Sequence, residues 1–271
     1  MSMPVAEKKH LGRVDADLLG YLKKDHRPLT CISLFTGCGG AALGIRLAGF
    51  EIRAMVEWDK NACKTLRANW IKPAGYKRPK KIEREKPLYP GDTWSNKTVH
   101  DWYQKRDPAI IEGDITKIPT EEILMRANLR VGECTLLEGG FPCQGFSMAN
   151  SKRGMHDERN FLYQECVRVI REAMPKTFLL ENVPGLVSME KGAIIRMICD
   201  DLAASGYQVS WDIHNAADYG VPQHRRRVII MGSRNDLMRF KEDGTPEYHI
   251  GGAGGPITHP AWFLKKYPVC E

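Results

Sequence analysis

The sequence LTCISLFTGCGGAALGIRLAGFEIRAMVE, at residues 29–57, contains a pattern from which a fold can be inferred. An apolar run at residues 29–35 ends in several glycines, which predicts a strand that enters a tight turn. Helix-forming residues with apolar spacing follow at residues 41–48, Gly49 ends this helix, and residues 51–57 predict a second strand. We therefore expect a strand, a glycine-rich turn, a helix and a second strand in succession.

Strand-like and helical segments continue to alternate along the rest of the chain. Further strands are predicted at residues 135–137, 177–180, 210–214 and 228–232, with helices at residues 161–174 and 191–205. This alternation predicts an α/β fold, a Rossmann-like and mostly parallel sheet with helices on both faces. The ligand crevice of such a sheet lies at one edge of the strands.

Composition limits the class of protein. The chain has 271 residues, 42% of them hydrophobic, which suffices to bury the core of one large domain. It has no apolar run long enough to span a bilayer, and residues 1–11 are polar rather than a signal peptide, so we expect an intracellular protein. The formal net charge of +7 suits a polyanionic partner but is weak evidence for one. The eight cysteines include no C-x-x-C pair, which argues against a zinc site, another metal or a disulfide scaffold.

Three regions flank or interrupt the predicted domain at residues 29–235. Residues 1–28 are polar and mixed in charge and form a lead-in. An insertion at residues 71–108 combines lysines and arginines with tyrosines and tryptophans; a solvated loop is the simpler explanation, and a loop that contacts DNA is the alternative. Residues 236–271 include a glycine-rich stretch and are interpreted as a linker or tail.

The glycine-rich turn has the spacing of a nucleotide-binding site. Gly37, Gly39 and Ala42 fit the G-x-G-x-x-G/A pattern, in which the backbone approaches a ligand at a helix N-terminus. A purely structural turn would explain this match alone equally well. Glu57 lies twenty positions after Gly37, at the end of the second strand, where a carboxylate can accept hydrogen bonds from both ribose hydroxyls. The spacing favours a nucleoside ligand, either NAD or S-adenosylmethionine.

Two further residues could complete that site. Trp58 could stack on an adenine ring, and Asp114 lies where a third strand should end and could accept a hydrogen bond from the adenine amino group. A core position is an equally good explanation of Trp58 at this point, as is a turn or helix cap for Asp114.

A second group of residues carries reactive side chains. The sequence GGFPCQ at residues 139–144 follows a short apolar strand, so Cys143 lies on a loop at the end of that strand. A lone cysteine is more often an inert buried residue, but this position suits a nucleophilic thiolate stabilised by N–H dipoles or positive charge. Glu181 ends the next strand at the same edge, where its carboxyl group can be kept protonated and donate to a ring nitrogen. A surface or helix-capping glutamate is the alternative.

Arginines precede the last predicted strand. In the sequence QHRRR at residues 223–227, alternation would direct Arg225 and Arg227 to one face of the strand and Arg226 to the other. An exposed basic cluster is the alternative.

Together, and in this order, these motifs resemble those of the DNA cytosine-5 methyltransferase family. The matching segments lie at residues 35–40, 57–58, 113–115, 142–144, 161–162, 181–183 and 223–227. The combination is far more specific than any single element. The resemblance implies a class I S-adenosylmethionine-dependent methyltransferase, with S-adenosylhomocysteine as its product and no metal. It also implies that the cofactor-binding residues are Phe35, Thr36, Gly37, Cys38, Gly40, Glu57, Trp58, Asp114, Ile115, Pro142 and Leu162.

The same resemblance implies covalent catalysis on double-stranded DNA. Cytosine C5 is a poor nucleophile, and addition of the Cys143 thiolate at C6 activates it for attack on the methyl group. Glu181 would hydrogen-bond N3 and the exocyclic amine, and Asn182 would orient the loop. Arg225 and Arg227 would fix the base and Glu181. The target cytosine must be flipped out of the stack, because C5 and C6 are covered in duplex DNA.

The sequence departs from the family after its last matching motif. Residues 233–271 show neither a target-recognition region nor the two motifs that accompany it in the family. We hypothesise that the chain is the catalytic subunit of a split enzyme of a restriction-modification system, whose partner polypeptide supplies these parts. A truncated or inactive fragment is the alternative. On this hypothesis the protein acts in the cytoplasm, at the nucleoid of a prokaryotic cell.

Three other functions fit part of the sequence. An NAD-dependent dehydrogenase would use the glycine-rich turn and Glu57 but leaves Cys143, Glu181 and the arginines without a role. A tRNA cytosine-5 methyltransferase of the same lineage would share the cysteine-based chemistry. A non-catalytic DNA-binding or regulatory subunit would need neither Cys143 nor Glu181.

Overall fold

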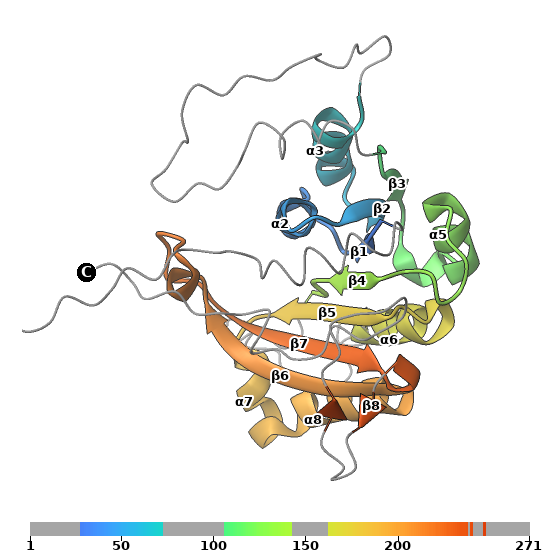
Figure 1. Cartoon of the computed structure of the whole chain (residues 1–271). Coiled ribbons are helices and arrows are strands. Elements are labelled where there is room, and N and C mark those ends of the chain that lie inside the picture. The colour runs from blue at the N-terminus through green and yellow to red at the C-terminus, as the bar shows by residue number, and fades with distance from the viewer. Residues whose placement is uncertain (1–27, 73–105, 143–161, 238, 241–245, 248–271) are drawn as a thin grey trace, which may run out of the picture.

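The computed structural model describes residues 28–72, 106–142, 162–237, 239–240 and 246–247. These residues form a seven-stranded sheet in the order β3-β2-β1-β4-β5-β7-β6, with helices on both faces (Figure 1). The predicted α/β fold with a mostly parallel sheet is thereby confirmed. Most of the lead-in, most of the basic insertion, the loop that carries Cys143 and most of the tail lie outside the described residues.

The segment at residues 29–57 folds as its pattern predicts. The strand β1 (Thr30–Leu34) leads into the glycine-rich turn, the helix α2 (Gly40–Leu47) follows, and the strand β2 (Glu51–Glu57) lies parallel to β1. The helix α3 (Lys60–Trp70), which the pattern left unassigned, and the strand β3 (Ala109–Glu112) come next, and β3 pairs with β2. The turn therefore lies at the carboxyl edge of the parallel strands.

The remaining elements add the second half of the sheet and its helices. In chain order they are η1 (Ile115–Lys117), α5 (Thr120–Ala127), β4 (Leu136–Gly139), α6 (Leu162–Ala173), β5 (Thr177–Asn182), α7 (Gly185–Ser188), η4 (Met189–Gly192), α8 (Ala193–Ala204), β6 (Tyr207–Asn215), η5 (Ala216–Tyr219), β7 (Arg226–Arg234) and η6 (Asn235–Leu237). The strands β8 (Arg239–Phe240) and β9 (Pro246–Glu247) form a separate two-stranded sheet. The last three strands of the large sheet extend further than the apolar runs that predict them.

One strand of the large sheet runs against its two neighbours. The strands β1 to β5 are mutually parallel, whereas β7 lies antiparallel between β5 and β6. Because β7 is reversed, its first residues lie beside the last residues of β5, and Val228 pairs in register with Asn182. Alternation of strands and helices does not predict this reversal, since β6 and β7 are joined without a crossover α-helix.

Two apolar layers hold the helices on the sheet. On one face, α2 and α3 pack through Ala42, Cys63, Leu66 and Trp70. On the other face, α5, α6 and α8 pack through Ile123, Leu124, Cys166, Val169, Ile170, Ile194, Ile195, Ile198 and Leu202. Every residue of β1 and β4 is buried, as expected for parallel strands covered on both sides.

The helix predicted at residues 191–205 begins later than its pattern suggests. Glu190 and Lys191 have φ angles of 45° and 54°, and Gly192, at 83°, is the left-handed N-cap of α8. Left-handed residues cannot continue a right-handed helix, so α7 and η4 form a separate segment before α8. Among the described residues, no helix is long and apolar enough to cross a membrane.

Candidate active site

The glycine-rich turn has an unusual backbone. It is left-handed at Phe35 (φ 52°), Gly37 (58°) and Gly39 (89°). A bulky residue such as Phe35 is rarely held in this conformation, and such residues cluster at functional sites. At Gly39 space is also limiting, because an added Cβ atom would lie 2.8 Å from Trp70 Nε1 and 2.9 Å from Leu66 Cδ2. Gly39 is therefore required both by the turn and by the packing of α3.

Glu57 ties the turn to the end of β2. Its Oε2 atom accepts a hydrogen bond from the Gly37 N–H at 2.6 Å, and its Oε1 atom accepts from the N–H groups of Trp58 and Asp59 at 2.9 and 2.8 Å. Three backbone donors use only part of the acceptor capacity of a carboxylate. Glu57 can therefore also accept hydrogen bonds from a ligand beside the turn.

The open side of the turn has room for such a ligand. An added Cβ atom at Gly37 or Gly40 would meet no atom within 4 Å. The helix α2 begins there, and the first N–H groups of a helix have no intrahelical partner. Trp58 is 75% exposed, which rules out the core position considered from the sequence and leaves its indole ring accessible for stacking.

Asp114 lies just beyond β3 and is the N-cap of η1. Its Oδ1 atom accepts hydrogen bonds from the Thr116 hydroxyl at 2.8 Å and from the Thr116 N–H at 3.1 Å. These hydrogen bonds lower the pKa of Asp114, so its carboxylate is ionised at neutral pH. The helix cap considered from the sequence is present, and contact with an adenine ring stays a prediction.

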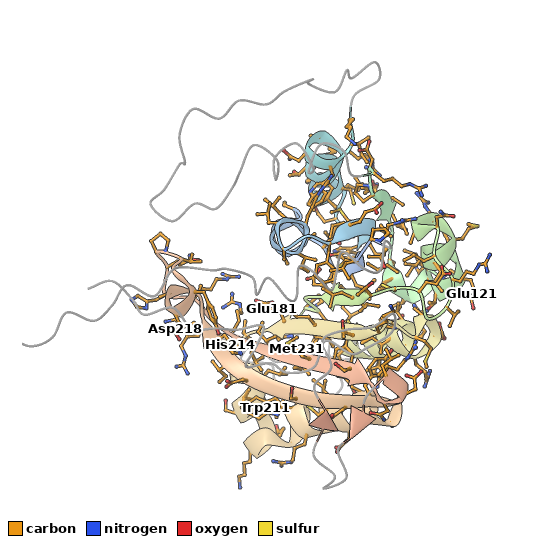
Figure 2. All side chains as sticks on the ribbon, viewed as in Figure 1. Glu121, Glu181, Trp211, His214, Asp218 and Met231 are labelled. Atoms are coloured by element: carbon orange, nitrogen blue, oxygen red, sulfur yellow. The ribbon has the colours of Figure 1, made fainter. Side chains whose placement is uncertain are left out.

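A carboxylate and a guanidinium form a close ion pair where β5 and β7 lie side by side. Arg227 Nε lies 2.6 Å from Glu181 Oε1, and both side chains are partly exposed. The reversal of β7 produces this contact, because it brings the start of β7 to the end of β5. Figure 2 shows Glu181 and His214 at this end of the sheet.

The loop that leads to Cys143 starts against this ion pair. An added Cβ atom at Gly140 would lie 3.5 Å from Glu181 Oε2, at van der Waals distance, so the start of the loop lies next to this carboxyl group. The buried Asn182 side chain donates from Nδ2 to the carbonyl oxygen of Phe141 at 3.1 Å. Cys143 itself lies outside the described residues, two positions after Phe141.

Arg225 is held through its backbone. Its N–H donates to Asn215 Oδ1 at 2.9 Å, and its carbonyl oxygen accepts from the Ala216 N–H at 2.9 Å. These two hydrogen bonds close the loop between β6 and β7 and fix the backbone of the arginine-rich sequence just before β7. Sequence reasoning missed Asn215, although an asparagine at the end of a strand and before a turn is a recognisable signal.

Sequence reasoning also missed a second carboxyl group, within β4. Glu138 is 3% exposed, and its Oε2 atom accepts a hydrogen bond from the Ser33 hydroxyl at 2.6 Å. Burial raises the pKa of Glu138 to about 7, and the charge of Glu181 contributes to the increase. The sequence feature that could have identified Glu138 is a lone glutamate in an otherwise apolar strand.

Three buried or partly buried thiols of the described residues are unsuited to nucleophilic catalysis. Burial raises the pKa of Cys134 to about 12 and that of Cys199 to about 11, and it raises the pKa of Cys166 well above its usual value. A thiol that stays protonated is a poor nucleophile. Within the described part of the chain, no group of His, Cys, Asp and Glu side chains could hold a metal ion.

The remaining predicted cofactor residues lie in three places. Thr36 is buried and Cys38 exposed within the turn. Ile115, the first residue of η1, is buried in the larger core. Pro142 precedes the undescribed loop, and Leu162, partly buried against the larger core, begins α6 after it. The structure therefore groups the turn with Glu57 and Trp58, and groups Glu181 with Asn182 and Arg227.

The chain is similar to known proteins along most of its length. The family model for C-5 cytosine-specific DNA methylases matches residues 29–90 and 91–251. The chain is 37% identical over 211 residues to the type II methyltransferase M.AquIA of Picosynechococcus sp., a match that covers 75% of this chain and 71% of that protein. It is 35% identical over 242 residues to the type II methyltransferase M.BsuRI of Bacillus subtilis, covering 85% of this chain but 50% of that protein.

A solved structure supports the fold. A protein described as a DNA modification methyltransferase encoded within an E. coli prophage aligns with a TM-score of 0.57 and 24% sequence identity. The alignment covers 84% of this chain and 52% of that one. The chain thus spans about half the length of this protein and of M.BsuRI.

Proposed function

Because the chain belongs to the C-5 cytosine-specific DNA methylase family, we propose that it methylates C5 of cytosine in double-stranded DNA. The observation that carries this proposal is the ion pair of Glu181 and Arg227 at 2.6 Å, beside the start of the loop that leads to Cys143. A carboxyl group, a fixed cation and a nearby cysteine are the groups that covalent activation of a pyrimidine ring requires.

The glycine-rich turn suits S-adenosylmethionine as the methyl donor. When bound, this cofactor supplies a methyl group on a positively charged sulfur atom, and S-adenosylhomocysteine remains. Glu57 would accept hydrogen bonds from the ribose hydroxyls, and the exposed Trp58 ring would stack on the adenine. The open space at Gly37 and Gly40 lets the ligand approach the backbone.

Cys143 is the nucleophile in this proposal. Its thiolate adds to C6 of the target cytosine, and the electron pair of the C5–C6 double bond moves toward C5, which then bonds to the methyl carbon. Loss of the C5 proton to a base and expulsion of the thiolate restore the double bond. The cysteine is thereby regenerated, and 5-methylcytosine is released.

Glu181 and its neighbours bind the target base. Glu181 would hydrogen-bond N3 and the exocyclic amine, while Arg227 holds its carboxyl group in place. Asn182 orients the loop through the carbonyl oxygen of Phe141. The base reaches this site only after it leaves the duplex stack, so base flipping is part of the proposal.

We further propose a second polypeptide that carries the target-recognition region, as in a split enzyme of a restriction-modification system. The length of M.AquIA supports this. Its 211 matched residues make up 71% of it, so most of M.AquIA is matched by this chain. The 242 matched residues of M.BsuRI make up only 50% of that much longer protein. Type II methyltransferases related to this chain therefore include both short and long polypeptides.

The proposed function is tested with tritiated S-adenosylmethionine and either duplex DNA or tRNA, with and without a candidate partner polypeptide. We expect 5-methylcytosine in DNA, formed with the partner and abolished by Cys143→Ala. Methylation of tRNA instead would identify the other class of cytosine-5 enzyme. Site-specific methylation by the chain alone would contradict the need for a partner.

A further inference from the structure

Glu138 is a buried carboxyl group to which the proposed reaction assigns no role. It lies in β4 and pairs in register with Ser33 of β1 on one side and with Leu179 of β5 on the other. The Ser33 hydroxyl donates to Glu138 Oε2 at 2.6 Å, and the Thr36 hydroxyl lies 3.0 Å from both the Oγ atom and the carbonyl oxygen of Ser33, so that it can donate to either. Three buried side chains thus connect the glycine-rich turn to the middle of the sheet.

The far end of this connection lies near the proposed catalytic carboxyl group. Side chains two residues apart on a strand point to the same face, so Glu181 shares a face with Leu179 and Glu138. In the register of β4 and β5, Glu181 is a diagonal neighbour of Glu138. Glu138 therefore interacts with the turn through hydrogen bonds and with Glu181 through its electric field.

We propose that Glu138 is a positioning residue for methyl transfer, which fixes the glycine-rich turn relative to Glu181 through Ser33 and Thr36. This inference rests on the proposed function, because it deepens the roles given there to the turn and to Glu181. Glu138 acts through other residues and is not placed in contact with cofactor or substrate. A misplacement of about 1 Å can slow an enzymatic reaction about 100-fold, so a link between the two halves of the site has a large effect on rate.

A second polar link between the same two strands provides a contrast. Near the start of β1 and just before β4, the Thr135 N–H donates to Thr30 Oγ1 at 3.0 Å, and the Thr30 N–H donates to Thr135 Oγ1 at 3.2 Å. Both threonines are buried and uncharged. Hydroxyl groups alone therefore suffice to support the pairing of β1 with β4, whereas a buried carboxyl group adds a desolvation cost. The carboxyl group of Glu138 therefore serves a purpose other than pairing the strands.

The charge of Glu138 also bears on the reaction. Within the described ranges, the charge of Glu181 in β5 raises the pKa of Glu138, and Glu138 in turn contributes to the raised pKa values of Cys31 in β1 and Cys166 in α6. When Glu138 ionises, its negative charge lies near Glu181 and opposes the build-up of electron density on the activated base. We therefore expect methyl transfer to slow as Glu138 loses its proton.

Three variants of the full chain test this inference, with the recognition partner present where methylation requires it. Glu138→Gln keeps the size and an acceptor for Ser33 but cannot ionise. Glu138→Ala removes the link, and Thr135→Val, the matched control, removes a buried hydroxyl between the same strands. The measurements are the thermal midpoint, amide hydrogen exchange of residues 35–40, and the single-turnover rate of methyl transfer as a function of pH.

We expect Glu138→Ala and Thr135→Val to lower the thermal midpoint by similar amounts. Only Glu138→Ala should speed hydrogen exchange in the turn and slow methyl transfer, by about 10- to 100-fold. Glu138→Gln should keep a rate close to that of the wild type in mild acid. Its rate should not show the decline at higher pH that accompanies ionisation of Glu138 in the wild type.

Two outcomes separate failure of this inference from failure of the proposed function. If the wild type methylates DNA but Glu138→Ala is no slower than Thr135→Val, the inference is overturned and the proposed function stands. If the wild type transfers no methyl group, the proposed function fails. Amide hydrogen exchange can be measured on a protein that has no methyltransferase activity. If exchange in the turn of Glu138→Ala equals that of the wild type, the inference is overturned even when no methyl transfer is observed.

Discussion

The two halves of the proposed site are built from different kinds of chemical group, backbone groups in one half and side chains in the other. Around β1, β2 and α2, backbone groups predominate: left-handed glycines shape the turn, and three N–H groups bind the carboxylate of Glu57. Around β4, β5 and β7, side chains predominate, with Arg227 on Glu181 and Asn182 on a loop carbonyl. A backbone site depends on local sequence, whereas a side-chain site depends on distant strands that meet in register.

This difference predicts different responses to substitution. Changes in the backbone half should alter folding stability and cofactor affinity together, because the same glycines serve both the turn and the packing of α3. Changes in the side-chain half should alter the rate of methyl transfer with little effect on stability, because Glu181 and Arg227 are partly exposed.

Glu181→Gln should produce the largest effect. Glutamine has nearly the same shape but cannot transfer a proton, so we expect the single-turnover rate to fall by roughly 10²- to 10⁴-fold. The thermal midpoint should stay close to that of the wild type, since 34% of the Glu181 side chain is exposed. A near-normal rate would show that Glu181 is not a catalytic residue and would contradict the proposed difference between the two halves of the site.

Gly39→Ala should be the most damaging change in the backbone half. The φ angle of 89° and contacts of 2.8 and 2.9 Å with Trp70 and Leu66 leave no room for a methyl group. We expect a loss of roughly 2–4 kcal/mol in the free energy of unfolding, measured in urea, together with weaker cofactor binding in calorimetry.

Gly44→Ala is the matched control for that change. Gly44 lies inside α2, and an added Cβ atom there meets nothing within 4 Å. Alanine should therefore stabilise the helix by about 0.5–1 kcal/mol. Equal stability of the two variants would show that the turn does not constrain position 39.

The pH dependence of stability should reveal Glu138. Its pKa is about 7 in the folded protein and about 4.5 in an unconstrained chain, so its favourable contribution is fully present below about pH 4.5 and is lost as the pH rises through about 7. Relative to Glu138→Gln, the wild type should lose roughly 1–2 kcal/mol between mildly acidic and mildly basic pH in urea titrations. Parallel curves for the two proteins would contradict the burial of an ionising group, and Thr135→Val should follow the wild type.

Trp58→Ala should have the smallest effect. With 75% of Trp58 exposed, the free energy of unfolding should change by less than about 0.5 kcal/mol. Cofactor binding should weaken by roughly 0.5–1.5 kcal/mol, the value of one aromatic contact, and Trp58→Phe should recover part of it. Unchanged affinity in calorimetry would place the adenine elsewhere.

The backbone half could be predicted from the sequence almost completely. The strand β2 has its predicted bounds, Glu51–Glu57, and the turn lies between its predicted strand and helix. Each of these features depends on residues close together in the chain, such as glycines before a helix former. The exposure of Trp58 and the capping role of Asp114 depend on their surroundings, so the sequence left both open.

The side-chain half could be predicted only in part. Glu181 follows from its place at the end of an apolar strand, and Arg227 from its motif. The reversal of β7 that joins them follows from neither, because the pairing of β5 with β7 joins residues far apart in the chain. Glu138 escaped notice for the same reason: its partner Ser33 lies 105 positions away. Cys143 lies outside the described residues, so its role stays a prediction.

Covalent trapping tests the central claim most directly. Duplex DNA containing 5-fluorocytosine, S-adenosylmethionine, the chain and its candidate partner are incubated together, and the denatured products are mapped by mass spectrometry. Because fluorine at C5 cannot leave as a proton does, we predict a stable adduct on the peptide that contains Cys143, absent in Cys143→Ala. An adduct on another residue, or none although the protein methylates normal DNA, would contradict the account.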